Sequence, residues 1–198
     1  MSKEMRIFNV TNLIQIKDRI IKGPSIQLVN GEYFYLRHIA ESMQHVDIEV
    51  IAAGLSKICR FTGQTREFYS VAQHVCLCHD YAPPGEERNA LFHDSSEVII
   101  GDVSTPLKSI LPAYKKLQNK LDSAFMEHFS YIETPTVKQL DGIALMTERR
   151  DLMPPTKEKW AVDVAPWPEP IEPWDPKRAE REFLDRALAS ENVRQLAA

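Results

Sequence analysis

The sequence predicts an all-α, mainly helical protein with a small β-hairpin near its N-terminus. From about residue 37 onward, apolar residues recur at the three-to-four-residue spacing of amphipathic helices, between recognisable caps and proline breaks. Before that point, the β-prone runs 26–29 and 33–35 flank Asn30-Gly31, a dipeptide typical of tight hairpin turns. At 198 residues the chain is long enough to bury one sizeable core, so a single domain over 1–198 is expected.

The first two expected helices are marked by residues that favour N-caps. Asp47 can cap a helix whose apolar face consists of Ile48, Ile51, Ala52, Leu55 and Cys59. Ser70-Val71-Ala72-Gln73 has the form of a capping box and begins a helix that carries His74. Pro83-Pro84-Gly85 ends that helix.

Three further helices are expected in the middle of the chain. One covers about 86–100 and stops at Gly101. Pro112 opens the next, whose apolar stripe consists of Tyr114, Leu117, Leu121, Ala124 and Phe125. A third covers 135–153, where Pro154-Pro155 breaks it.

The C-terminal part, 154–198, is expected to follow a core of about 36–153. Between Pro154 and Pro176 the tryptophans stand among prolines, which predicts an extended strap pinned to the body by its aromatic rings: Trp160, Trp167 and Trp174. Asp175-Pro176 then caps a last helix whose inward face consists of Ala179, Phe183, Ala187 and Leu188.

The composition is typical of a soluble globular protein, with 43% hydrophobic and 26% charged residues. A net charge of -4 argues against nonspecific binding to a nucleic-acid polymer. No apolar stretch approaches the length of a membrane span, and the N-terminus, with Lys3, Glu4 and Arg6, lacks the apolar core of a signal segment. The cysteines are not spaced as a zinc knuckle, which predicts reduced thiols and a cytoplasmic location.

Polar groups interrupt the expected helix 86–100 in an apolar context. His93 and Glu97 are four residues apart and share a helix face, and Asp94 lies next to them around the helix. Burying such a cluster is costly unless something offsets its charge. A divalent metal ion would do so.

Two residues elsewhere complete a candidate ligand set. His74 stands among apolar neighbours on its helix, so it is either a hydrogen-bonded core histidine or a ligand. Asp141 shares a face with apolar residues, where an acid is unusual unless it caps, ligates or pairs with Arg149 or Arg150. Two histidines and two carboxylates make a mixed nitrogen and oxygen ligand set that suits Mn, Co, Fe, Ni or Zn.

The H…HD…D pattern of these residues resembles the signature of the HD-domain metal-dependent phosphohydrolases. A wider match, over roughly 36–153, resembles the bacterial HD-domain 5'-deoxynucleotidases and phage dATP triphosphohydrolases, and implies a helical HD-type bundle. The segments that carry it are Arg60-Phe61, Tyr69-Ser70-Val71-Ala72-Gln73-His74, His93-Asp94-Ser95-Ser96-Glu97-Val98 and Gly101-Asp102-Val103-Ser104-Thr105-Pro106-Leu107-Lys108.

The resemblance implies one divalent ion per subunit (Co, Mn, Zn, Ni, Fe or Mg). The ligands it implies are His74, His93, Asp94 and Asp141. It also implies catalytic roles for Glu97, which would orient the attacking water, and for Asp102, which would handle the proton. Dinuclear members carry further histidines, whereas Glu97 follows the HD pair here, so a mononuclear site is expected.

Four residues are candidates for binding the substrate. Arg60 matches the substrate-contacting arginine of the family, and Phe61 stands where the nucleotidase branch often has Trp, so its ring would stack on sugar or base. Arg66 and Lys108 are phosphate-binding candidates or ordinary surface charges.

The resulting expectation is metal-dependent hydrolysis of small deoxynucleotides at the α-phosphate. A 5'-nucleotidase acting on deoxynucleoside monophosphates is favoured, because no second cluster of Arg and Lys stands ready for further phosphates. The alternatives are a dNTP triphosphohydrolase that releases tripolyphosphate and a non-catalytic nucleotide-binding regulator, although a regulator would be free to lose Glu97 or Asp102. A homodimer or higher homo-oligomer is also expected, in which Trp167 or Trp174 either seals a subunit contact or packs within its own chain.

Overall fold

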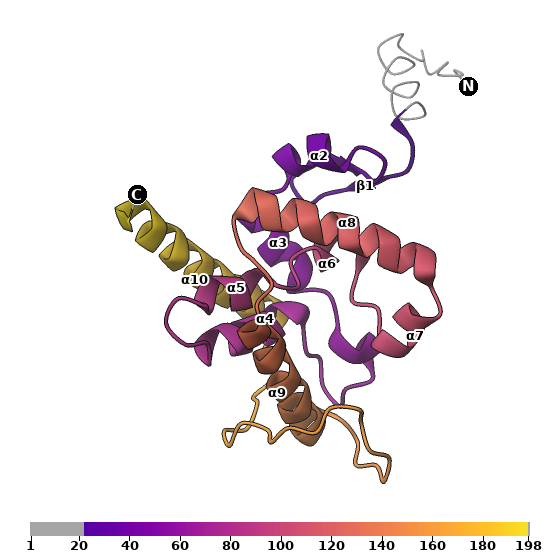
Figure 1. Ribbon diagram of the computed structural model, residues 1–198, viewed down its shortest axis with the longest axis vertical. Helices are drawn as coiled ribbons and strands as arrows, with labels where there is room; N and C mark the ends of the chain where they lie inside the picture. The colour runs from indigo at the N-terminus through magenta and orange to yellow at the C-terminus, as the bar shows by residue number, and fades with distance from the viewer. Residues whose placement is uncertain (1–21, 198) are drawn as a thin grey trace, which may run out of the picture. The chain divides into compact units, whose positions relative to one another are not determined.

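The computed structural model describes residues 22–197, with side chains described as far as residue 191. Lys3, Glu4 and Arg6, on which the expected lack of a signal segment rests, lie outside the described residues. The chain divides into two compact units, with the boundary between His45 and Val46. Most of the described chain is helical, which confirms the predicted all-α class with a small hairpin (Figure 1).

The N-terminal unit contains the predicted hairpin. Its elements are β1 (Ser25–Gln27), β2 (Tyr33–Tyr35), α2 (Ile39–Ser42) and the 3-10 helix η1 (Met43–His45). The strands are antiparallel, with Ile26 opposite Phe34. Gly31 adopts a φ of 89° in the connecting turn, a conformation that glycine enters at little steric cost. Phe34 is fully buried, so this small unit has an apolar centre.

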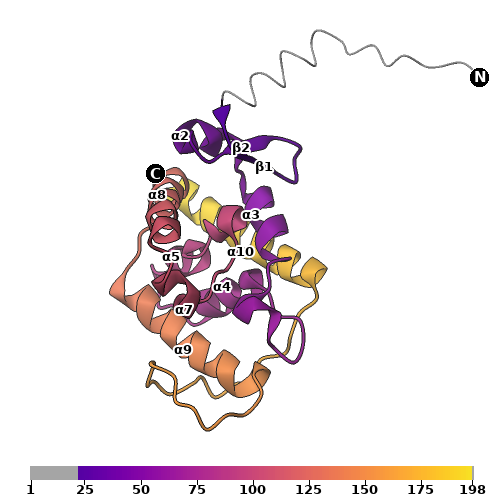
Figure 2. The same ribbon diagram turned by 90° about the vertical axis from the view of Figure 1, so that its right-hand side faces the viewer.

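The second unit is an arrangement of helices around α4. Its elements are α3 (Ile48–Leu55), the 3-10 helix η2 (Arg60–Gly63), α4 (Val71–Asp80), α5 (Glu87–Phe92), α6 (Glu97–Ile100), α7 (Thr105–Ser109), α8 (Pro112–Phe129), α9 (Pro135–Leu152) and α10 (Pro176–Ala197). Helix α4 contacts α3, α5, α9 and α10 and thus occupies the centre of the unit (Figures 1 and 2). A side chain on α4 can therefore meet residues from several distant parts of the sequence.

The predicted helix starts are confirmed by side-chain caps. Asp47 Oδ1 accepts a hydrogen bond from Val50 N at 2.7 Å, and Ser70 Oγ accepts one from Gln73 N at 3.2 Å. Asp175 Oδ1 accepts one from the backbone of α10. Each cap satisfies a backbone donor that the first helical turn leaves unpaired, which is why these local signals locate the helices.

The prediction of a single helix over 86–100 is wrong, because a turn at 93–96 separates α5 from α6. The imidazole Nδ1 of His93 lies 2.8 Å from the carbonyl oxygen of Ala90, the acceptor that Asp94 N–H would use in a continuous helix. The backbone tightens instead to three-residue spacing, with Ser95 N donating to Phe92 O. The His93-Asp94 pair therefore lies in a break between two short helices.

Two other details of the predicted helices are wrong. Helix α3 ends at Leu55, so Cys59 lies beyond it, where it forms an isolated β-bridge with Ser70. Leu188 is 50% exposed, whereas the fully buried face of α10 consists of residues four apart: Ala179, Phe183 and Ala187. Leu188 follows Ala187 directly and so points about 100° away around the helix.

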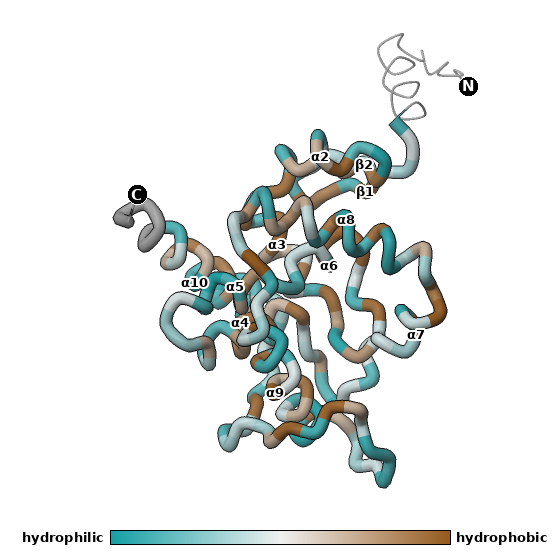
Figure 3. Tube along the Cα trace, in the orientation of Figure 1, coloured by the Kyte–Doolittle hydropathy of each residue, from teal (hydrophilic) through white to brown (hydrophobic). Residues whose placement is uncertain are grey.

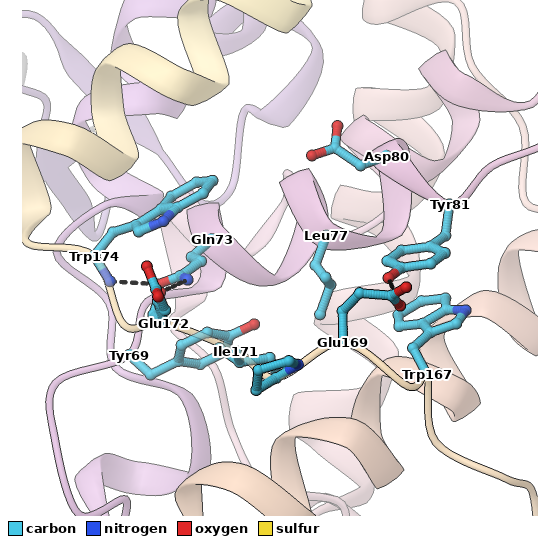
Figure 4. A pocket seen from close by; sticks show the side chains of 11 residues that line it. Tyr69, Gln73, Leu77, Asp80, Tyr81, Trp167, Glu169, Ile171, Glu172 and Trp174 are labelled. Carbon is cyan, nitrogen blue, oxygen red and sulfur yellow. Dashed lines mark hydrogen bonds between the residues drawn. The ribbon is translucent and has the colours of Figure 1, made fainter.

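The strap between α9 and α10 is held against α4 by polar and aromatic contacts (Figure 4). The Gln73 carboxamide donates to the carbonyl oxygen of Glu172 at 2.7 Å and accepts from Trp174 N at 2.8 Å. The rings of Trp167 and Tyr81 stack with centroids 4.1 Å apart. A cavity of about 230 Å³ lies between the strap and α4. These contacts confirm the pinned strap, and they place Trp167 and Trp174 in contacts within one chain.

The hydropathy of the surface is uneven. Apolar residues occur where α7 is followed by α8 (Figure 3), and three of them are exposed: Leu107 in α7, and Ile110 and Leu111 between the two helices. Among the described residues, no helix has both the length and the apolar composition required to cross a bilayer.

Candidate metal centre

The four predicted metal ligands come together between α4, the 93–96 turn and α9. His74 Nε2 lies 3.3 Å from His93 Nε2, 3.6 Å from Asp94 Oδ2 and 3.2 Å from Asp141 Oδ1. His93 Nε2 lies 3.4 Å from Asp94 Oδ2. Ligands that share one ion through bonds of about 2.0–2.2 Å lie about 3–4 Å apart. The mutual spacing of the His74, His93 and Asp94 atoms fits a common ion, and Asp141 adjoins this group through His74.

The hydrogen bonds of both imidazoles direct their Nε2 lone pairs toward one point. His93 Nδ1 bonds to the carbonyl oxygen of Ala90, so its proton belongs on Nδ1. His74 Nδ1 lies 2.6 Å from Glu148 Oε1, which places its proton there as well. In a metal-bound form both Nε2 atoms would be unprotonated; they face each other across 3.3 Å, with carboxylates alongside. The donor set fits a divalent cation, which would satisfy all of these lone pairs at once.

The opposite charges of His74 and Asp141 shift their pKa values so that the charged form of each is favoured. Burial and Arg60 lower the pKa of His74, but the negative groups around it, including Glu148 and Asp141, outweigh them and raise it well above its usual value. Burial raises the pKa of Asp141, yet hydrogen bonding and attraction from His74 hold it well below its usual range. A positive charge at this point is therefore favourable, as a cation would be.

Glu148 lies beneath the cluster and was not anticipated from the sequence. It is fully buried on α9, where its Oε1 accepts from His74 and its Oε2 accepts from Arg60 at 3.1 Å. Burial raises the pKa of Glu148, but Arg60 and then His74 lower it below its usual value. Glu148 stands seven residues after Asp141, two helical turns along the same face, and that spacing was the available signal.

Arg60 forms ion pairs with two carboxylates of the protein. Only 8% of the residue is exposed, and its guanidinium lies between Glu148 and Asp94, at 3.1 and 3.5 Å. Phe61 and Thr62, which follow it in η2, adopt left-handed backbone angles with φ of 54° and 55°. Such angles cost non-glycine residues on the order of 1 kcal/mol each and concentrate near functional sites.

The Phe61 ring contacts aromatic and cationic groups near η2. Its centroid lies 5.8 Å from that of Trp160 on the strap, and the Arg60 guanidinium carbon lies 5.4 Å from it. The two rings form an aromatic wall beside Arg60.

Burial raises the pKa values of the acids at 97 and 102. Glu97 is buried, and its Oε2 is one of the buried side-chain atoms of the described residues that have no hydrogen-bond partner. Its Oε1 lies 3.6 Å from Lys108 Nζ. Burial raises the pKa of Glu97 well above its usual value, and Asp94 and Asp102 act in the same direction. Burial likewise raises the pKa of Asp102.

A cavity of about 180 Å³ opens beside the cluster. Its wall combines metal-ligand candidates with acids, a cation and apolar groups, among them Asp94, Asp141, Glu97, Lys138, Met126 and Tyr131. Arg66 does not reach it, because its guanidinium donates to the carbonyl oxygen of Asp151 at the end of α9.

Cys78 also adjoins the cluster and was not anticipated. Its Sγ lies 3.9 Å from His74 Nε2, one turn further along α4. Burial raises the pKa of the Cys78 thiol, and His74 offsets part of that rise.

The fold and the cluster define a mainly helical protein in which two histidines and two carboxylates meet beside its central helix α4. No family model matches the chain. The uncharacterized protein YfdR of Escherichia coli K12 is 42% identical over 130 residues, which cover 64% of this chain and 71% of YfdR. This chain therefore belongs to the family of YfdR. An uncharacterized protein of Rhodobacter capsulatus is 37% identical over 89 residues, 40% of this chain and 45% of that protein.

Proposed function

We propose that the chain is a metal-dependent phosphohydrolase of the HD-domain type that cleaves deoxynucleotides at the α-phosphate. Its favoured activity is that of a 5'-nucleotidase on deoxynucleoside monophosphates. The observation that carries the proposal is the convergence of metal-ligating atoms from three segments distant in sequence: His74, His93, Asp94 and Asp141.

These residues would hold one divalent ion per subunit, with Co, Mn, Zn, Ni, Fe and Mg as candidates. When bound, the ion would supply Lewis acidity and neutralise phosphate charge during attack by water. Glu148 fixes the tautomer of His74, and the carbonyl oxygen of Ala90 fixes that of His93. Both imidazoles are thereby oriented before any ion arrives.

Glu97 and Asp102 are proposed to manage the proton transfers. The free Oε2 of Glu97 is buried beside the cluster, so it can align a water molecule and accept its proton. The raised pKa values of both acids keep a carboxylic proton available closer to neutral pH than usual. Asp102 would return a proton to the 5'-oxygen of the departing nucleoside.

The charges around the cavity support a single phosphate better than three. Lys108 lies beside Glu97 and can approach a phosphate oxygen. Among the described residues that line the cavity, Lys138 is the cation, and its Nζ already lies 3.1 Å from a carboxylate oxygen of Glu133. A triphosphate would require more positive charge than this lining offers.

The cellular setting is part of the same proposal. Cys59, Cys76 and Cys78 are all free thiols, which agrees with a reducing cytoplasm. Self-association remains a prediction, to be tested by light scattering after gel filtration. Within the chain, Trp167 stacks on Tyr81 and the backbone N–H of Trp174 donates to Gln73, and a subunit contact through either tryptophan stays a prediction.

The test is turnover by metal-stripped protein to which single metals are restored. With dAMP, orthophosphate and deoxyadenosine are expected, and a variant combining His93→Ala and Asp94→Ala should form neither. Tripolyphosphate from dATP, with dAMP untouched, would favour the triphosphohydrolase. If metal binds but neither nucleotide is turned over, the enzyme proposal is wrong and a nucleotide-binding regulator is favoured.

A further inference from the structure

Cys78 brings a third kind of ligand atom to the cluster. Helix α4 places it four residues after His74, so both side chains lie on one helix face. One ligand atom from each of His74, Cys78 and His93 lies within 4.8 Å of the other two. The nearest approach of the thiol is the 3.9 Å between its Sγ and His74 Nε2.

These separations are compatible with one shared ion. A thiolate binds zinc at about 2.3 Å and an imidazole at about 2.0–2.1 Å, so two such ligands of one ion lie about 3–4 Å apart. The 3.9 Å between Sγ and His74 Nε2 falls in that range, and the His93 ligand atom lies within 4.8 Å of Sγ. Cys78 is fully buried, and its Sγ lies on the side of α4 that carries His74.

The ordinary role for a buried cysteine is core packing, and part of Cys78 fulfils it. The residue belongs to an apolar cluster together with Ala90, Val137, Leu140 and Ala144. Packing alone, however, does not explain why the sulfur atom lies beside His74 Nε2 in a group of potential ligand atoms. Cys76 offers the contrast: it is equally buried on the same helix, but the charged groups that influence it are Arg186, Asp80 and Glu182.

We propose that the Cys78 thiolate is a ligand of the metal ion, which makes the centre a mixed sulfur, nitrogen and oxygen site selective for Zn²⁺ or Co²⁺ over Mg²⁺ and Mn²⁺. This inference rests on the metal centre of the proposed function. Thiolate is a soft ligand that favours zinc and cobalt, whereas magnesium and manganese prefer oxygen. On binding, the S–H bond breaks, an Sγ–metal bond forms and the proton leaves to solvent.

The test is the absorption spectrum of the cobalt-loaded protein, because a thiolate ligand gives an intense sulfur-to-cobalt charge-transfer band in the near ultraviolet. The band is expected in the wild type and in Cys76→Ser, the matched control, and is expected to be absent in Cys78→Ser. Zinc affinity should fall at least about tenfold in Cys78→Ser, with a smaller change for Mn²⁺.

Two outcomes would overturn the inference and can be told apart. If the wild type and Cys78→Ser bind cobalt with the same spectrum, Cys78 is not a ligand, although the metal centre stands. If the wild type binds no cobalt, the inference fails together with the metal centre. Should Cys78→Ser not fold, X-ray absorption of the zinc-loaded wild type decides: a sulfur neighbour at about 2.3 Å supports the inference, and nitrogen and oxygen neighbours alone contradict it.

Discussion

Replacing Glu148 with Gln should destabilise the protein strongly, although the substitution preserves the size of the side chain. Glu148 is fully buried and neutralises the buried guanidinium of Arg60 at 3.1 Å. In Glu148→Gln, the remaining carboxylate in contact with Arg60 is that of Asp94, at 3.5 Å. Removing one partner of a buried ion pair costs about 3–5 kcal/mol. The amide oxygen of Gln can still accept one hydrogen bond, so we expect about 3 kcal/mol.

Urea unfolding followed by circular dichroism, in the presence of a chelator, measures this loss directly. For a chain of this length, about 3 kcal/mol corresponds to a drop in Tm of roughly 6–12 °C. The matched control is Glu133→Gln, which breaks a pair with Lys138 of the same 3.1 Å length, but between side chains 59% and 65% exposed. The control should lie within about 0.5 kcal/mol of the wild type.

The same substitution should weaken the metal centre, because Glu148 orients the His74 ring. Loss of such a supporting carboxylate typically costs 10–100-fold in metal affinity. If Glu148→Gln matched Glu133→Gln in both unfolding and metal titration, the reasoning about the buried network would be refuted.

Two further predictions concern packing and pH. A Cβ at Gly54 would lie 2.2 Å from a methyl carbon of Val98, so Gly54→Ala should lower the free energy of unfolding by about 1–3 kcal/mol. In Gly142→Ala the added carbon meets nothing closer than 3.7 Å, so this variant should raise the free energy of unfolding by up to about 1 kcal/mol. Changes of the same sign in the two variants, measured by urea unfolding, would contradict this. Partial burial raises the pKa of Asp80, but hydrogen bonds from His79 and Arg186 outweigh it and lower the pKa below the ordinary 3.8. The ion pair between Asp80 and Arg186 therefore stabilises the protein above pH 3.8, and this contribution is lost as the pH falls through the lowered pKa of Asp80. Asp80→Asn should lower the free energy of unfolding by about 1 kcal/mol at pH 7 and leave it unchanged at pH 2. A loss that is the same at both pH values would rule this out.

The helix boundaries could be predicted from the sequence because their causes are local. Asp47 and Ser70 accept hydrogen bonds from backbone N–H groups three residues further along the chain. Pro112 and Pro135 stand in the first turn of their helices, where a backbone N–H would have no partner within the helix. The break at 93–96 escaped prediction because it depends on a side chain that takes a backbone acceptor. The spacing of apolar residues in the sequence does not indicate where a side chain and a backbone N–H compete for the same carbonyl oxygen.

The candidate site was predictable to the extent that its residues looked out of place. His74 and Asp141 are polar residues on apolar helix faces, and the structure brings them within 3.2 Å across 67 positions of sequence. Glu148 and Cys78, by contrast, do not look unusual in their sequence context. A cysteine on an apolar face is ordinary, and Glu148 is followed by two arginines that suggest a solvent-exposed helix end. Their significance comes from tertiary neighbours, which a single sequence does not display.

The central claim is that the side chains of His74, His93, Asp94 and Asp141 form a metal site. Calorimetric titration of metal-stripped protein with Co²⁺ or Zn²⁺ tests it most directly, with the variant combining His93→Ala and Asp94→Ala alongside. We expect one tightly bound ion per chain in the wild type and a loss of that binding in the variant. A wild type that binds no ion, or a variant that binds one equally well, would contradict it.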